Sequence, residues 1–76
     1  IDVRGFRADE AIQAVPYFID DAIRFNAHRV RILHGTGTGV LRQVIRDYLS
    51  TVQGVISARD EDVRFGGAGI TVVELD

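Results

Sequence analysis

Four short stretches of the chain carry the apolar and polar pattern of β-strands. Residues 1–4 alternate apolar and polar side chains and are followed by Gly5, which breaks the pattern. Residues 30–33 form the second predicted strand, and residues 55–59 form the third. The last stretch, residues 70–75, is the most continuously apolar of the four and predicts a buried strand.

Two longer stretches place apolar residues three and four positions apart, as amphipathic helices do. The first runs from Ala8 to Ile23, and Asn26 follows it as a residue able to adopt a left-handed cap. The second runs from Leu41 to Leu49. Pro16 falls inside the first helix, where it removes a backbone hydrogen bond and costs roughly 3 kcal/mol in a regular helix. We therefore expect a kink at that residue.

The predicted element order is βαβαββ, within a single domain of residues 1–76. Right-handed crossovers place both helices on one face of the sheet. The third strand carries Arg59, whereas the last is nearly all apolar, so the last strand is predicted to be internal and antiparallel. The fold class is α+β, an α/β two-layer sandwich with a four-stranded mixed sheet beneath two helices.

Composition narrows the function classes. The chain has 76 residues and a formal net charge of -2, which is not the basic balance typical of a nucleic-acid-binding domain. It contains no cysteine, which excludes a disulfide framework and a zinc finger and favours a reducing compartment, so we expect a cytoplasmic protein. No apolar run suits a membrane span or signal peptide. Because it begins at Ile1, we expect a piece of a longer chain.

Every basic side chain other than histidine is arginine, whose planar fork can hold a phosphate in two places. Strand alternation sends Arg4, Arg29 and Arg31 to the sheet face away from the helices, and Arg59 can join them from the edge. We expect this bare face to be a basic patch that meets nucleic acid, with Arg31 among the contacts.

The strongest local motif is the loop His34-Gly35-Thr36-Gly37-Thr38-Gly39 between a strand and a helix. Glycines let backbone N–H groups approach a ligand, and a helix N-terminus adds a positive dipole end. The motif is neither a P-loop nor the dinucleotide-binding fingerprint. From the residues alone, it is either a phosphate site or a tight structural turn.

Arg42 and Arg46 lie one turn apart on the following helix, where like charges repel. An anionic partner such as phosphate would relieve the repulsion, and a solvated helix face is the alternative. Asp2, Arg4 and His34 fall at the ends of two neighbouring parallel strands, so Arg4 and His34 should lie side by side next to the glycine loop. They could hold a phosphodiester and move a proton, or form only a surface ion pair and a structural histidine.

Three segments resemble the Smr (small MutS-related) domain: residues 1–5, 34–39 and 66–75. Ile1-Asp2-Val3-Arg4 matches the family's Leu-Asp-x-Arg motif, and the loop matches its His-Gly-x-Gly-x-Gly motif. The resemblance runs end to end and implies a fold similar to the C-terminal domain of translation initiation factor three. Thr36 stands where lysine is common in the family, which removes one phosphate contact.

The resemblance implies a nicking endonuclease domain for DNA, RNA or branched structures, at the C-terminus of a MutS-like protein acting in recombination suppression or ribosome rescue. Asp2 would orient or activate the nucleophile, Arg4 would grip the scissile phosphate, and His34 would act as acid or base. A flanking phosphate would be held by the loop and the next helix, through Gly35, Thr36, Gly37, Thr38, Gly39 and Arg42. Mg²⁺ or Mn²⁺ on Asp2 is a further hypothesis, although one carboxylate is a poor cage.

Two other functions remain open. The domain could be a non-catalytic module that delivers a MutS-like ATPase to DNA, RNA or the ribosome, with ATP bound only by other domains of that protein. It could instead be a structural or dimerising domain whose bare sheet face docks on the parent chain.

Overall fold

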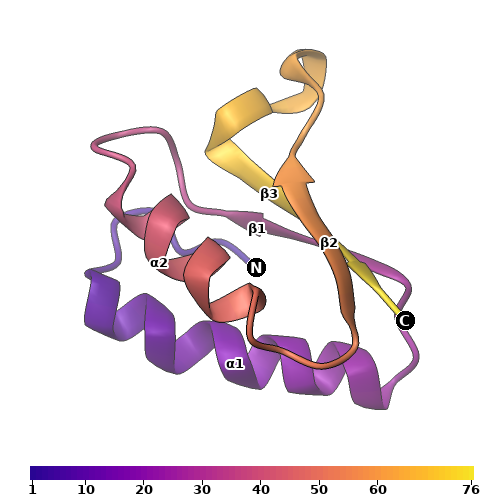
Figure 1. Cartoon of the computed structure of the whole chain (residues 1–76). Coiled ribbons are helices and arrows are strands. Elements are labelled where there is room, and N and C mark those ends of the chain that lie inside the picture. Colours follow the sequence, from indigo (N-terminus) through magenta and orange to yellow (C-terminus); the bar gives the residue numbers. More distant parts are fainter.

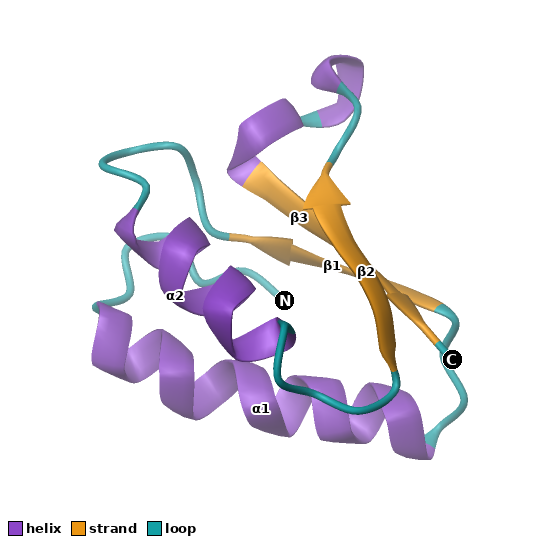
Figure 2. Ribbon diagram, in the orientation of Figure 1, coloured by secondary structure: helices purple, strands orange, loops and turns teal.

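A computed structural model describes all residues 1–76 and contains two helices over one antiparallel sheet (Figures 1 and 2). The elements in chain order are α1 (Ala8–Arg24), β1 (Arg29–Leu33), α2 (Val40–Leu49), β2 (Val55–Asp60) and β3 (Ile70–Leu75). Two short 3-10 turns, η1 (Val63–Phe65) and η2 (Gly67–Gly69), join β2 to β3. No helix has the length and apolar character needed to cross a membrane.

The sheet has the order β1-β3-β2, and β3 pairs antiparallel with both neighbours. This confirms the prediction that the last strand is internal and antiparallel. The register places Val72 between Arg31 on one side and Arg59 on the other. A register shift between Val55 and Ser57 marks a bulge in β2.

The predicted first strand is reduced to a single parallel bridge between Asp2 and Leu33. The N–H of Val3 donates to the carbonyl of Leu33 at 2.8 Å, and the N–H of Leu33 donates to the carbonyl of Ile1 at 2.9 Å. The chain then turns away at Gly5, so the segment is too short to continue the ladder. The sheet therefore has three strands rather than the predicted four, but the bridge still places residues 2–4 at the end of β1.

One core lies between the two helices and one face of the sheet. Its strand residues alternate along β1 and β3, which confirms that both helices cover the same face. Burying each large apolar side chain contributes about 1.5–3 kcal/mol. The fully or nearly fully buried members are Val3, Val15, Ile19, Ile32, Ile45, Leu49, Val73 and Leu75.

Helix α1 is capped at both ends as its sequence allows. The Glu10 carboxylate accepts a hydrogen bond from the N–H of Arg7 at 2.8 Å. Asn26 adopts the predicted left-handed conformation, with φ of 60°. The helix continues through Pro16 without a break, and the kink expected there stays a prediction. Ile12, whose carbonyl loses its partner to the proline, is exposed, so water can satisfy that carbonyl.

Candidate functional site

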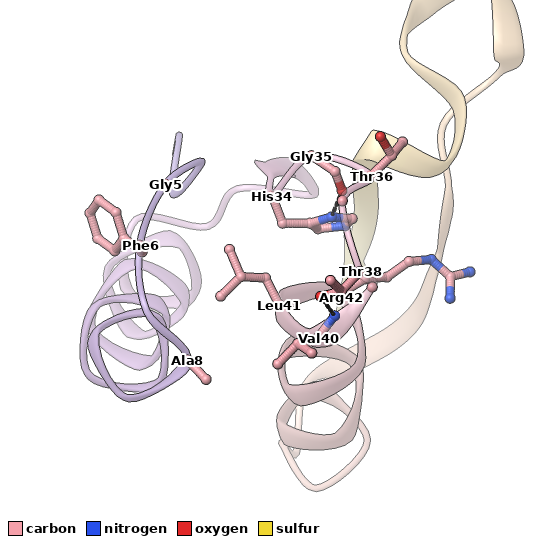
Figure 3. A pocket seen from close by; sticks show the side chains of 12 residues that line it. Gly5, Phe6, Ala8, His34, Gly35, Thr36, Thr38, Val40, Leu41 and Arg42 are labelled. Carbon is pink, nitrogen blue, oxygen red and sulfur yellow. Dashed lines mark hydrogen bonds between the residues drawn. The ribbon is translucent and has the colours of Figure 1, made fainter.

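The glycine loop and the N-terminus of α2 enclose an open hollow of about 290 Å³ at one end of the sheet (Figure 3). Residues 34–39 line one side, and Gly5, Phe6 and Ala8, around the start of α1, line the other. The loop is tied to the sheet because the N–H groups of His34 and Gly35 both donate to the carbonyl of Gly69, at 3.1 and 3.0 Å.

Backbone N–H groups in this hollow are largely free to bind a ligand. Among residues 36–42, only Val40 donates, through a long 3.4 Å contact to the Thr38 hydroxyl. The other N–H groups of this stretch have no acceptor within the protein. They lie where the dipole of α2 is positive, so the hollow has the chemistry of an anion site.

His34 is only 5% exposed, and both of its ring nitrogens have partners. Nδ1 lies 2.8 Å from the carbonyl oxygen of Gly35, and Nε2 lies 2.8 Å from the hydroxyl of Thr71. Arg46 Nε donates to the same hydroxyl at 2.9 Å. A carbonyl only accepts, so the proton belongs on Nδ1. The Thr71 hydroxyl then accepts from Arg46 and donates to Nε2.

This network engages both ring nitrogens of His34, so neither of them is free to reach a ligand. The predicted acid or base role needs one of the two to reach a substrate, and neither does in this arrangement. The geometry instead matches the alternative of a structural histidine: His34 holds the carbonyl of Gly35 and thereby fixes the start of the loop. Neither Thr71 nor Arg46 was predicted as part of the site.

Asp2 and Arg4 form a two-pronged ion pair. Arg4 Nε donates to Oδ1 at 2.9 Å, Nη2 donates to Oδ2 at 2.7 Å, and the backbone N–H of Arg4 donates to Oδ1 at 3.0 Å. These side-chain and backbone hydrogen bonds from Arg4 lower the pKa of Asp2 to about 2. Asp2 is therefore ionised at neutral pH and fixes the plane of the guanidinium.

The residues present do not fit a divalent metal site. Both carboxylate oxygens of Asp2 already accept hydrogen bonds from Arg4. No group of three or more histidine, cysteine, aspartate or glutamate side chains gathers anywhere in the domain to hold a metal ion. Mg²⁺ and Mn²⁺ require several oxygen ligands, so the hypothesis of a metal on Asp2 has no ligand set.

Arg4 and His34 reach the same end of the sheet but line different hollows. His34 lines the hollow at α2, whereas Arg4 lines a second one of about 240 Å³ beside Gly66. Gly35 and Thr36 line both. The prediction that Arg4 lies beside the glycine loop is confirmed, because its Cγ stands 3.7 Å from the place of a Cβ on Gly35. His34 contacts Gly35 in a different way, through the hydrogen bond between Nδ1 of His34 and the carbonyl oxygen of Gly35.

Of the two alternatives left open for Arg42 and Arg46, the structure shows an anionic partner, and it lies within the chain. Nη2 of Arg42 and Nη2 of Arg46 donate to Oδ1 of Asp60, at 2.9 and 2.6 Å. The hydrogen bond from Arg42 is the larger cause of a lowered pKa at Asp60. Figure 3 shows the Arg42 side chain extending away from the hollow. The repulsion on α2 is therefore relieved without phosphate, and phosphate binding by Arg42 stays a prediction.

The bare face of the sheet is not the basic patch that strand alternation predicted. Arg29, Arg31 and Arg59 do lie there, but Glu74 accepts from Arg29 at 2.8 Å and from Arg59 at 3.0 Å. Glu61 pairs with Arg31. These hydrogen bonds from arginine lower the pKa of both glutamates. The face is a mixed ion-pair network with one positive charge in excess.

The ion pairs predict an acid dependence of stability. Five carboxylates have a pKa below the usual values of 3.8 or 4.5 because arginine hydrogen-bonds to their ionised forms: Asp2, Asp60, Glu61, Asp62 and Glu74. A carboxyl group whose pKa is lower in the folded state than in the unfolded state stabilises the fold. This contribution is complete above the pKa of the unfolded state, and it is lost as the pH falls through the pKa of the folded state.

The melting temperature should therefore fall progressively from near pH 4.5 towards about 2. Melting followed by circular dichroism from about pH 7 to about pH 2 measures this. Glu74→Gln should fall less steeply than the wild type. A melting temperature that stays constant as the carboxylates protonate would contradict the pairing.

Comparison with known proteins agrees with the motifs. The family model described as the Smr domain matches residues 1–76. The chain is 49% identical over 75 residues to the endonuclease MutS2 of Bacillus cytotoxicus and 47% identical over 75 residues to that of Bacillus mycoides. In each case the match covers 99% of this chain and 10% of the relative, so the chain spans a tenth of those proteins.

Two solved structures share the fold. The Smr domain of Thermus thermophilus MutS2 superposes with a TM-score of 0.96 and 39% identity, covering 100% of this chain and 95% of that one. YdaL, a stand-alone small MutS-related protein from Escherichia coli, gives a TM-score of 0.92 at 22% identity, covering 99% of this chain and 62% of that one. The whole-length family match and the superposition together establish that this chain belongs to the Smr domain family.

Proposed function

We propose that this domain binds the backbone of nucleic acid at the glycine loop and Arg4, and nicks a phosphodiester bond there. The observation that carries the proposal is the Arg4 guanidinium, fixed by Asp2, on a side chain whose Cγ lies beside Gly35 at the start of the loop that carries the free N–H groups. The relatives named endonuclease MutS2 support the cleavage step.

Two kinds of hydrogen-bond donor would bind phosphate at this site: backbone N–H groups and the Arg4 guanidinium. The free N–H groups of residues 36–42 would hold one phosphate in the hollow at α2. Arg4 would hold the scissile phosphate and stabilise the charge that develops on its oxygens. In hydrolysis, a water oxygen bonds to phosphorus while the bond from phosphorus to a sugar oxygen breaks, and that oxygen takes up a proton.

Asp2 and His34 would support these contacts from behind. Asp2 sets the orientation of Arg4 through its paired hydrogen bonds. His34, held by Thr71, sets the position of Gly35 and so of the loop. We assign His34 a positioning role in place of proton transfer, because both of its nitrogens are occupied.

The domain would be one part of a longer MutS-like protein, because the matched region is only 10% of the relative from Bacillus cytotoxicus. Its location at the C-terminus of that protein, in the cytoplasm, is part of the proposal, as is a role in recombination suppression or ribosome rescue. DNA is the first substrate to test, and RNA or the ribosome is the second. ATP would be bound by other domains of the parent protein.

A non-catalytic binding module is the second candidate. Two observations favour it: His34 has no free nitrogen, and no cluster of carboxylates gathers at the site. Such a module would use the same loop N–H groups and Arg4 to bind a phosphate backbone without breaking it.

One assay separates these functions. The chain is incubated with supercoiled plasmid and with labelled single-stranded DNA and RNA, with and without Mg²⁺ or Mn²⁺. An identically purified Arg4→Gln variant controls for contaminating nuclease. Nicked product from the wild type alone supports the endonuclease. Salt-dependent binding without cleavage supports the binding module, and the absence of both would overturn the two proposals in favour of a structural or dimerising role.

A further inference from the structure

The chain contains a second Asp-Val-Arg segment, at residues 62–64, built like the one at residues 2–4. Arg64 Nε donates to Asp62 Oδ1 at 3.0 Å, Nη2 donates to Oδ2 at 2.9 Å, and the backbone N–H of Arg64 donates to Oδ1 at 2.9 Å. The donors and acceptors are the same atoms as in the Asp2–Arg4 pair. A second guanidinium is therefore held in a fixed plane.

This second segment stands out from the body of the domain. Residues 62–66, here called the tip, lie in the connection between β2 and β3, and this connection projects beyond the sheet (Figure 1). Val63 is 88% exposed, the Arg64 side chain 75% and Phe65 66%. The apolar and aromatic side chains of the tip are therefore exposed to water and do not belong to the hydrophobic core.

The backbone of the tip admits little variation. Gly66 has φ of 132°, which side-chain-bearing residues rarely adopt. A Cβ at that position would overlap the side chain of Ile70 in β3. The tip is therefore anchored on the end of β3 by a residue that must be glycine.

The tip offers flat faces more than positive charge. Asp62 neutralises Arg64, and the guanidinium Cζ of Arg64 lies 5.4 Å from the centre of the Phe65 ring. Unlike Arg4, Arg64 has no run of free backbone N–H groups beside it, because the N–H groups of Asp62, Arg64 and Phe65 already donate within the chain, so a phosphate would gain little there. A nucleobase suits the surface better, because bases stack on aromatic rings and on arginine planes whatever their sequence.

The tip adjoins the place proposed for the scissile phosphate. The hollow of about 240 Å³ that Arg4 lines is also lined by Gly66 of the tip and by Gly35 and Thr36 of the loop. A strand with a phosphate at Arg4 would therefore run past the base of the tip, with a neighbouring base within its reach.

We infer that an unstacked base of the strand held at Arg4 stacks on the exposed Phe65 ring of the tip, beside the Arg64 guanidinium that lies over that ring. This inference rests on the proposed function and deepens it by naming the substrate class: single-stranded or locally unpaired nucleic acid. A base in an intact duplex is stacked on both sides and cannot reach the tip without being unstacked, at a cost of a few kcal/mol.

The test uses a single fluorescent reporter. The chain has no tryptophan, so Phe65→Trp creates one at the tip. Phe25→Trp is the matched control, because Phe25 is 78% exposed at the far end of α1. Adding a single-stranded oligonucleotide should quench Phe65→Trp by base stacking and leave Phe25→Trp unchanged, and the matched duplex should quench Phe65→Trp less.

Affinity provides the second readout. Phe65→Ala should weaken binding of the single strand by about 5-fold to 150-fold, the range for loss of one stacked base, whereas Phe25→Ala should not. Because Phe65 is exposed, both variants should melt like the wild type.

The outcomes distinguish the two proposals. Suppose that the wild type binds the oligonucleotide, but that the fluorescence of Phe65→Trp and the affinity of Phe65→Ala stay unchanged. The inference is then overturned and the proposed function stands. The exposed tip would in that case suit a protein partner. If the wild type does not bind nucleic acid, the proposed function itself fails.

Discussion

Replacing Arg4 with lysine is expected to lower the nicking rate by about 100-fold or more, the loss typical of removing one donor to a developing oxyanion. Lysine keeps the positive charge but cannot form the two-pronged contact that Asp2 now fixes. The melting temperature should stay within experimental error of the wild type, because both side chains are exposed and surface pairs contribute little.

Arg7→Lys is the matched control for this prediction. Arg7 is another exposed arginine, paired with the neighbouring Asp9 at 3.0 Å, but it lines neither hollow. Its substitution should leave nicking unchanged. Wild-type nicking by Arg4→Lys, or an equal loss in both variants, would show that Arg4 has no special role in cleavage.

Replacing His34 with alanine is expected to destabilise the domain by about 2–5 kcal/mol. The change leaves a cavity in a buried site and takes away the acceptor of the Thr71 hydroxyl. Thr71→Val keeps the shape of the side chain but leaves His34 Nε2 and Arg46 Nε without their partner, at about 1–3 kcal/mol. Denaturant unfolding measures both.

The pair of substitutions also tests the positioning role of His34. Since both residues belong to one hydrogen-bond network, the double variant should lose less stability than the two single losses added together, by about 0.5–3 kcal/mol. A positioning role predicts weaker nucleic-acid binding in Thr71→Val as well as in His34→Ala. Additive losses would contradict the shared hydrogen-bond network. Normal binding in Thr71→Val, with nicking abolished only in His34→Ala, would favour proton transfer by His34.

Periodicity predicted the parts of the fold that depend on burial. Helices α1 and α2 bury the apolar side chains that recur at helical spacing, such as Val15 and Ile45. The continuous apolar run of β3 indicated a central strand, and it lies between β1 and β2. The residues before Gly5 show why a short alternating segment is less informative: four residues of pattern yielded only one bridge.

The ion pairs between residues far apart in the sequence were not predictable from local pattern, because they depend on strand register and on how the elements pack. Asp60 meets Arg46 across 14 positions, and Glu74 meets Arg29 across 45. Strand alternation assigned the arginines to a face but did not reveal which acidic residue lay opposite each. The predicted basic patch was wrong for this reason.

Thr71 was missed although the sequence contains a signal for it. It is a polar residue in the most apolar strand, in step with Val73 and Leu75, which face the helices. An inward-facing hydroxyl must find a partner, and the histidine at the end of the neighbouring strand supplies one. The rule that sites gather at strand ends located the loop and Arg4 but not the network behind them.

Binding of nucleic acid at the glycine loop and Arg4 can be tested by observing which groups of the protein a strand contacts. Backbone and arginine N–H signals of the ¹⁵N-labelled chain are followed by nuclear magnetic resonance while a single-stranded oligonucleotide is added. We expect the shifts to concentrate in residues 36–42 and at Arg4 Nε–H. Shifts confined to the outer side of α1, at Asp20 and Asp21, with residues 36–42 unmoved, would contradict it.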